Sequence, residues 1–315
     1  MEKSIFDIII EEIMDIEVSS SIDKEAAIDN INRLKDQKLN ILFVGATGVG
    51  KSSTINSIFN TEIAKVGYST DPETMNIQKY EMGNLILWDS PGLGDNPEKD
   101  KRYANEIINA LKEKDADGQL VIDEVVVLVD GSNRDMRTAF EIMEKIVIPY
   151  IGNVERMVIA INQCDMALKG RYWNYDACQP EEQLVDFLEQ KVCSVKERIM
   201  LSTGICTKPF YYSAYYHYNI SRLLLEMLGS IPVEKRVFVA DNLNQDPNVW
   251  QKNDELANYN NEIKEVMTGS IKKALEGAAA GAVAGATVGS LIPVIGSAVG
   301  AAVGAVLGFL GGLIG

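Results

Sequence analysis

The sequence predicts an α/β fold: a doubly wound, mostly parallel sheet, preceded by helices and followed by a helical hairpin. Three observations support this. Apolar segments of strand length alternate with segments of helical periodicity across residues 39–232. A glycine-rich loop joins the first of these strands to a helix. Residues 277–315 contain no Asp, Glu, Lys or Arg, so the chain divides into a charged body and an uncharged tail.

Composition excludes several functional classes. The 315 residues include 30 basic and 45 acidic side chains, a net charge of −15, which disfavours general nucleic-acid binding. The four cysteines form no CxxC pair and there is one histidine, so reduced thiols are expected rather than a zinc site. The apolar run near the N-terminus is acidic-flanked, unlike a secretory signal. We therefore expect the body of the protein to be cytoplasmic.

The elements follow one another in a regular order. Residues 3–17 and 21–37 have helical periodicity, which favours packing helices, or helices that pair two molecules. We predict strands at 40–44, 76–81, 85–88, 124–129, 157–161 and 210–213, and helices at 50–59, 98–114, 135–148, 180–200, 217–229 and 253–275. The predicted division is 1–38 helical segment, 39–240 main domain, 241–276 linker and helix, and 277–315 hairpin.

A phosphate-binding loop is predicted at residues 45–52, which read GATGVGKS and match GxxxxGK[ST] between a strand and a helix. Its backbone amides are suited to surround a β-phosphate, and the helix N-terminus adds positive potential. Lys51 is expected to contact the β- and γ-phosphates, and Ser52 to bind Mg²⁺. The predicted nucleotide contacts here are Gly45, Thr47, Gly48, Val49, Gly50, Lys51, Ser52 and Ser53.

Residues 89–92 read DSPG and end the strand predicted at 85–88. Asp89 is expected to contact Mg²⁺ through water, and the Gly92 amide to bond the γ-phosphate, so that hydrolysis releases the following segment. A threonine that reaches both Mg²⁺ and the γ-phosphate is expected within residues 66–77. We favour Thr74 over Thr70 because Thr74 lies two residues before the next predicted strand.

Residues 162–165 read NQCD after the strand predicted at 157–161. Asp165 can accept hydrogen bonds from N1 and N2 of guanine. Adenine lacks this donor pair, so an ATPase is disfavoured. Asn162 and Gln163 complete this motif. Ser213 and Ala214 follow the last predicted strand, where the Ala214 amide is suited to bond O6 of guanine.

These four motifs, in this order, resemble the translation-factor class of P-loop GTPases, and among them the Era/TrmE-like branch. Residues 45–59 are also similar to septins, chloroplast import receptors and GIMAP-like GTPases. The resemblance covers residues 39–232. It implies binding of GTP and GDP, hydrolysis of GTP, and a requirement for Mg²⁺. Lys51, Thr74 and Gly92 are then the expected catalytic residues, and Ser52, Thr74 and Asp89 the expected metal contacts.

Three positions depart from this family. Gln163 replaces the usual lysine of the guanine motif, which predicts lower affinity because its stem is shorter and uncharged. Leu93 stands where Ras-like proteins have a water-orienting glutamine, so another group must assist hydrolysis. Gly48 replaces the asparagine of potassium-dependent relatives, which argues against potassium activation. Arg134 and Arg137 are either surface arginines or groups that act in trans across a nucleotide-dependent homodimer.

The tail has glycines at every fourth residue in two runs, 277–289 and 296–312, with Pro293 between them. This spacing predicts two helices with close-packing glycine faces, broken near the proline. Residues 294–315 have the length of a bilayer span, whereas 277–292 are short for one. We favour a membrane-inserted hairpin or span. The alternatives are a hairpin that docks on its own domain or exchanges with a partner, and a tail without a defined structure.

The sequence therefore predicts a GTP-hydrolysing switch that contacts membrane lipid through residues 277–315. A weakly hydrolysing, nucleotide-gated interaction protein and a membrane-disrupting effector remain the alternatives. The phosphate-loop motif and the guanine motif are consistent with all three functions. Rates of GTP hydrolysis and effects on membranes distinguish these functions.

Overall fold

The computed structural model describes the sheet domain and parts of the N-terminal segment. The residues described are 6, 7, 10, 11, 14, 28, 29, 31–59 and 77–276. Most of the predicted helix 3–17, both candidate threonines Thr70 and Thr74, and the predicted hairpin 277–315 lie outside them.

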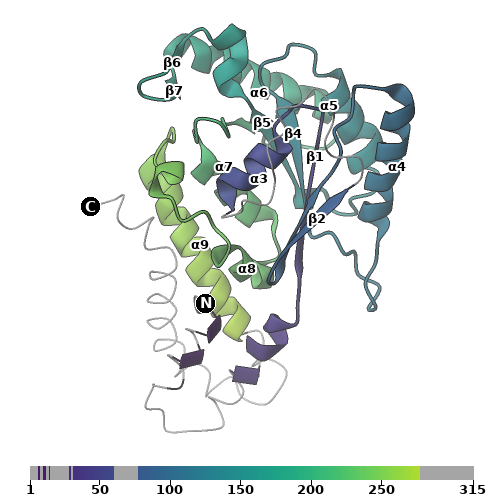
Figure 1. The fold of residues 1–315 in the computed structure, drawn as a ribbon, viewed down its shortest axis with the longest axis vertical. Coiled ribbons are helices and arrows are strands. Elements are labelled where there is room, and N and C mark those ends of the chain that lie inside the picture. Colours follow the sequence, from purple (N-terminus) through teal and green to yellow (C-terminus); the bar gives the residue numbers. More distant parts are fainter. Residues whose placement is uncertain are drawn as a thin grey trace.

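A six-stranded mixed sheet forms the centre of the molecule (Figure 1). Its only antiparallel pair within the described chain is the outer hairpin that turns at Gly83; the other four pairings are parallel. The fold class predicted from the sequence is thus confirmed. In order across the sheet the strands are β2 (Gln78–Met82), β3 (Leu85–Asp89), β1 (Leu39–Gly45), β4 (Glu124–Asp130), β5 (Met157–Asn162) and β8 (Phe210–Tyr211).

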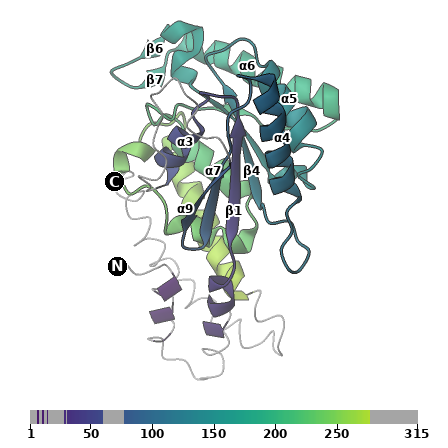
Figure 2. The ribbon, with the colours of Figure 1, turned by 45° about the vertical axis from the view of Figure 1, so that its right-hand side comes forward.

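Helices cover both faces of the sheet (Figure 2). One face packs against α3 (Lys51–Ile58), α7 (Ile220–Ser230), α8 (Val237–Ala240) and α9 (Leu256–Glu276). The other packs against α4 (Pro97–Lys112), α5 (Arg137–Glu141) and α6 (Glu182–Thr203). Shorter helical turns connect them: η1 (Ile142–Val147), η2 (Val154–Arg156), η3 (Cys164–Gly170), η4 (Val233–Lys235) and η5 (Pro247–Trp250).

The inner strands β1, β4 and β5 are largely apolar on both sides because each side meets a helical layer. In β1, Ile41 and Phe43 point into one hydrophobic cluster, whereas Leu42 and Val44 point into the other. All seven residues of β1 are buried. This arrangement leaves the carboxyl ends of the parallel strands as the edge where polar side chains can gather.

Two regions differ from the expected elements. The helix predicted at 135–148 is divided in the structure. Its first part is α5, and the chain then continues as the wider π-helical turn η1. At the end of this turn the Ile148 amide donates to the Met143 carbonyl at 2.9 Å. A small hairpin, β6 (Trp173–Asn174) with β7 (Gln179–Pro180), precedes α6. Strands of two residues are too short to leave a periodic signal in the sequence.

Residues 241–276, predicted as a linker and a helix, pack against the sheet domain. Trp250 is fully buried, and its indole nitrogen donates to the Asn244 carbonyl at 2.8 Å. Along α9, Ile263, Met267 and Ile271 recur at intervals of four residues and are buried in the same cluster as α7. This spacing places them on one face of the helix.

Replacing Met267 by alanine is expected to lower the free energy of unfolding by about 2–5 kcal/mol, because a buried side chain is removed and a cavity remains. Urea unfolding of the full chain measures this change. The matched control is Glu265→Ala on the exposed side of the same helix, for which a change within about 0.5 kcal/mol is expected. Equal effects of the two substitutions would contradict the packing of α9.

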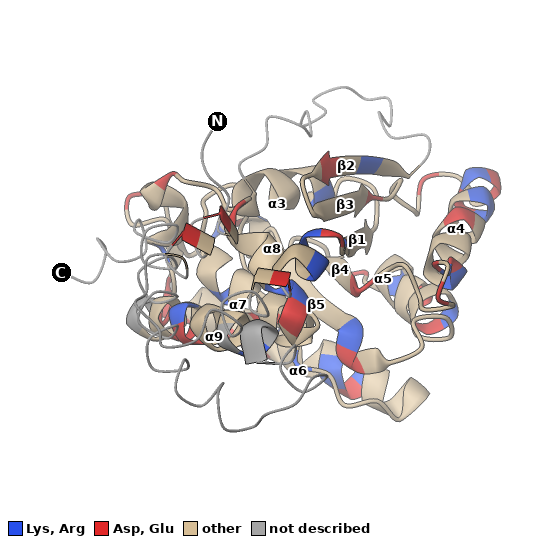
Figure 3. Ribbon diagram, turned by 90° about the horizontal axis from the view of Figure 1, so that it is seen from below, with Lys and Arg blue, Asp and Glu red and all other residues tan. Residues whose placement is uncertain are grey.

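Charged residues of both signs lie along the described body, including α4 and α6 (Figure 3). Their distribution is mixed, as expected for solvated helices. Among the residues that the structure describes, no helix is both long enough and apolar enough to cross a bilayer.

Candidate nucleotide-binding site

The phosphate loop connects β1 to α3 and depends on its glycines. Gly48 and Gly50 have φ angles of 72° and 91°, in the left-handed region that favours glycine. A Cβ atom at Gly50 would lie 2.4 Å from Nδ2 of Asn162, and one at Gly45 would lie 2.9 Å from the Leu128 carbonyl oxygen. The loop is therefore packed so closely that only glycine fits at these positions. No side chain caps the N-terminus of α3, so its amides are available to an anion.

Lys51 and Ser52, the first residues of α3, lie beside the end of β3. The Ser52 hydroxyl donates to Oδ2 of Asp89 at 2.7 Å. The other oxygen of Asp89, Oδ1, is buried and has no hydrogen-bond partner among the described residues. Burial raises the pKa of Asp89, which nearby Lys51 partly offsets, and burial likewise lowers the pKa of Lys51. A hydroxyl and a carboxylate with an unpartnered oxygen are suitable ligands for Mg²⁺.

The segment after β3 lies directly against the phosphate loop. The Leu93 amide donates to the Gly45 carbonyl at 3.3 Å, and the Thr47 amide donates to the Leu93 carbonyl at 3.0 Å. Leu93 itself is buried, so its side chain packs inward rather than toward a substrate. A Cβ atom at Gly92 would lie 2.4 Å from Cα of Thr47. Gly92 thus lies against the backbone of the phosphate loop, and its predicted bond to a γ-phosphate stays a prediction.

Asp165 lies at the carboxyl end of β5, in the turn η3. It is buried, and its Oδ1 atom has no partner among the residues that the structure describes. Burial raises the pKa of Asp165, and a hydrogen bond with the Ser213 side chain opposes this rise. Ser213 follows β8, the neighbouring strand, and is fully buried. A buried carboxylate oxygen without a partner is suited to a ligand that carries N–H donors.

Asn162 connects the two halves of the site. Its Nδ2 donates to the Val49 carbonyl at 2.8 Å, and its Oδ1 accepts from the Ala214 amide at 3.0 Å. The sequence predicted that Asn162 contacts the nucleotide and that the Ala214 amide bonds O6 of guanine. In the structure the Ala214 amide donates to Asn162, and Asn162 in turn donates to the phosphate loop.

Gln163 also contacts the phosphate loop. Its Nε2 donates to the Gly48 carbonyl at 2.8 Å, and its backbone has the unusual φ of 59°. The sequence analysis expected this glutamine to hold the loop less well than lysine. The amide in fact reaches the loop and bonds it without a charge.

Comparisons with known proteins find relatives of the sheet domain. Residues 40–163 match the family described as 50S ribosome-binding GTPase. Over these residues the sheet domain resembles a P-loop GTPase.

Two curated proteins share short segments with this chain. The probable GTP-binding protein EngB of Methanococcus aeolicus is 32% identical over 95 residues, 30% of this chain and 41% of that protein. Translocase of chloroplast 126 of Physcomitrium patens is 39% identical over 85 residues, 25% of this chain and 7% of that protein. The chain therefore matches less than half of the length of either relative.

Among solved structures, Era of Aquifex aeolicus bound to GDP and AlF4⁻ is similar to this chain. The two are 17% identical with a TM-score of 0.42, over 62% of this chain and 57% of that chain.

Gly92→Ala is expected to slow GTP hydrolysis by the GTPase by about ten- to a hundredfold, because the added Cβ would push this segment away from Thr47 and misplace it. The GDP affinity should change less than about threefold, since Gly92 is assigned to the γ-phosphate that GDP lacks. Single-turnover assays and calorimetry measure the two quantities. Gly229→Ala, where a Cβ meets no atom within 4 Å, is the matched control. An unchanged rate for Gly92→Ala would contradict its assignment.

Three residues that the sequence motifs do not include also contribute to the site. Tyr212 and Thr54 pair through their hydroxyl groups at 2.6 Å, and the Ser57 hydroxyl donates to the Ala214 carbonyl at 3.1 Å. These bonds join α3 to the segment after β8. The sequence signal for them is their position alone: Thr54 and Ser57 lie two and five residues after the phosphate loop, and Tyr212 directly precedes Ser213.

The two arginines considered for catalysis in trans, Arg134 and Arg137, are both exposed in the loop after β4 and at the start of α5. The four cysteines are free thiols: Cys164 is buried, Cys178 is partly buried, and Cys193 and Cys206 are exposed.

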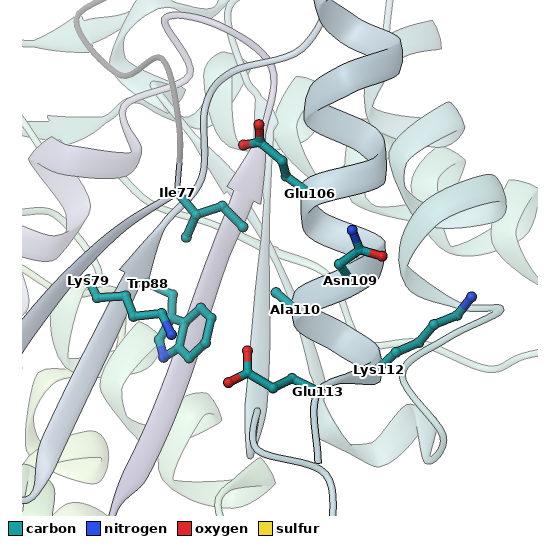
Figure 4. Close-up of a pocket in the computed structure, with 8 residues that line it drawn as sticks. All are labelled: Ile77, Lys79, Trp88, Glu106, Asn109, Ala110, Lys112 and Glu113. Atoms are coloured by element: carbon teal, nitrogen blue, oxygen red, sulfur yellow. The ribbon is translucent and has the colours of Figure 1, made fainter. Parts of the chain in front are cut away.

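A separate hollow of about 430 Å³ lies between β2, β3 and α4 (Figure 4). Trp88 forms part of its wall, and the ammonium group of Lys79 lies 3.5 Å from the centre of the indole ring. Glu106 and Asn109 border it from α4, and Glu113 borders it directly after that helix. Lys79 already occupies one face of the aromatic ring.

Proposed function

We propose that this chain binds GTP together with Mg²⁺, hydrolyses it to GDP, and acts as a nucleotide-dependent switch at a membrane. One observation carries the nucleotide part of the proposal. The buried, unpartnered carboxylate oxygen of Asp165 lies on one side of Asn162, and the glycine-rich loop lies on the other. A guanine nucleotide matches both features. Its base carries N–H donors for the Asp165 oxygen, and its phosphate chain carries anionic oxygens for the amides of the glycine-rich loop.

The chain's own residues supply binding and orientation. The amides at the start of α3 and the Lys51 ammonium stabilise negative charge on the phosphate chain. Ser52 and Asp89 are placed to hold Mg²⁺, which would neutralise charge on the β- and γ-phosphates. Asp165 selects guanine by accepting from N1 and N2, because adenine would leave this buried oxygen without a partner.

Hydrolysis requires help that the described residues do not provide in the usual place. Leu93 is buried and held to the phosphate loop by its backbone, so it cannot orient a water molecule. We therefore propose a nucleotide-dependent homodimer, in which exposed Arg134 or Arg137 of one molecule reaches the phosphates of the other. Under this proposal the specific activity rises with protein concentration, and substitution of the contributing arginine removes that rise.

The membrane part of the proposal depends on residues 277–315. The body carries all of the chain's net charge of −15, so anionic lipid repels it and attachment requires apolar burial of the tail. Because glycine and alanine bury little apolar surface, insertion is weak enough to be reversible. Such a tail is suited to binding in one nucleotide state only.

Two measurements on the full chain test the proposal. Single-turnover assays with Mg²⁺ should show hydrolysis of GTP but not of ATP. Equal rates with both nucleotides would contradict guanine selection, and negligible GTP hydrolysis would favour a nucleotide-gated interaction protein. Flotation with zwitterionic phosphatidylcholine vesicles should differ between GDP and a non-hydrolysable GTP analogue. Equal flotation in both states would contradict the switch, and no flotation would contradict the membrane contact. Dye leakage from the vesicles would favour a membrane-disrupting effector.

A further inference from the structure

Lys191, on α6, is buried against the loop that follows β4. Its Nζ atom donates to the backbone carbonyls of Asp130 at 2.9 Å, Gly131 at 2.8 Å and Asn133. The side chain is only 7% exposed. An ammonium group has three N–H donors and no acceptor, so three carbonyl groups satisfy it completely.

The same loop is also held from within. Oδ1 of Asp130 accepts from the amide of Ser132 at 2.8 Å, from its hydroxyl at 2.6 Å, and from the amide of Asn133 at 3.3 Å. The carboxylate is thus engaged by the turn itself, and the three backbone carbonyls are the hydrogen-bond acceptors of Lys191. Burial lowers the pKa of Lys191 to about 8, and Asp130 partly opposes this. Burying the Lys191 ammonium group is unfavourable in itself. Its three hydrogen bonds to the loop carbonyls offset this cost, and they also hold the loop in place.

The held loop packs directly on the guanine motif. The Gly131 amide donates to the Asn162 carbonyl at 2.7 Å. A Cβ atom at Gly131 would lie 2.4 Å from that carbonyl oxygen and 3.1 Å from the backbone of Gln163. Lys191 is therefore connected to Asn162 through the backbone of Gly131. Asn162 and the next residue, Gln163, both bond the phosphate loop and precede Asp165.

We propose that Lys191 is a positioning residue for guanine recognition: by clamping the loop 130–133, it sets the backbone of Asn162 and Gln163 and so aims Asp165 at the base. This inference rests on the proposed binding of guanine nucleotide. It assigns to α6 a role in nucleotide selection, although Lys191 lies in none of the four sequence motifs. Lys191 acts through the loop and does not itself contact the nucleotide.

Calorimetric titration of the full chain with GDP and with IDP, which lacks the 2-amino group of guanine, tests the proposal. Lys191→Met keeps most of the length of the side chain but removes its donors. It should raise the Kd for GDP about tenfold, because three backbone carbonyls lose their partner, and should bring the Kd values for GDP and IDP closer together. Lys191→Gln, which retains two donors, should fall between the wild type and Lys191→Met.

Lys196→Met is the matched control, because Lys196 lies on an exposed position of the same helix. It should leave both Kd values unchanged. If Lys191→Met does not fold, Gly131→Ala decides the question: it keeps the lysine but disturbs the same contact with Asn162, and should also narrow the difference between GDP and IDP.

Three results would overturn the inference. The first is a folded Lys191→Met protein with wild-type affinities. The second is an equal loss of affinity for GDP and IDP, which would indicate a general structural role. The third is a wild-type protein that does not bind GDP, which would contradict the proposed function and the inference with it, and so differs from the first two.

Discussion

Asp165→Asn is expected to raise the Kd for GDP about a hundredfold or more and to improve binding of XDP. The substitution replaces a carboxylate that accepts two hydrogen bonds with an amide that accepts at one atom and donates at the other. The NH₂ group of the new asparagine then faces the 2-amino group of guanine. Both groups are donors, so each lacks an acceptor in a buried site. Xanthine has a carbonyl group at this position, which the new donor can bond.

Calorimetric titration with GDP and XDP measures this exchange of preference. Asp176→Asn, on the exposed turn between β6 and β7, changes the net charge equally and controls for long-range electrostatics. A uniform loss of affinity for both nucleotides would indicate that Asp165 only maintains the local structure. An unchanged affinity for GDP would remove Asp165 from the site.

Lys51→Ala is expected to slow GTP hydrolysis by about a hundred- to a thousandfold, because it removes a buried cation that is placed beside the reacting phosphates. The burial that lowers the pKa of Lys51 also keeps water from screening its charge, so its contribution to binding phosphate is large. Affinity for GDP should fall as well, since the β-phosphate loses the same contact.

A single-turnover assay at saturating protein separates the rate of hydrolysis from binding. Lys101→Ala, at an exposed position of α4, is the matched control and should behave as the wild type. If the rate for Lys51→Ala equals that of the wild type at saturation, the lysine contributes to binding alone and not to the hydrolytic step.

The central fold could be predicted because each strand is bounded by a clear signal. The apolar run 124–129 predicted a strand buried on both faces, and β4 is buried in this way except for Asp130 at its end. The outer hairpin followed from the Gly83-Asn84 turn between two alternating segments, and it is the antiparallel pair of the sheet. Local patterns therefore sufficed wherever one segment alone decides its conformation.

The site could be predicted only as far as its motifs extend. GATGVGKS and NQCD named the two ends of the site, but the contacts that join them involve partners 113 and 52 residues apart, as Asn162 shows with Val49 and Ala214. Lys191 was not found for the same reason: its acceptors are backbone carbonyls, which every sequence contains. The packing of α9 depends on which face of the sheet the chain reaches, which periodicity does not specify.

The anchorage of α9 has a mechanical consequence. Glu276, directly before the uncharged segment, is the last described residue of a helix whose buried face is held in the domain by Ile263, Met267 and Ile271. A force applied to that segment would therefore act on α7 and the sheet, because α9 packs directly against α7. Tension on residues 277–315 would therefore act on the helical layer of α3, α7 and α9, which also packs beneath the phosphate loop.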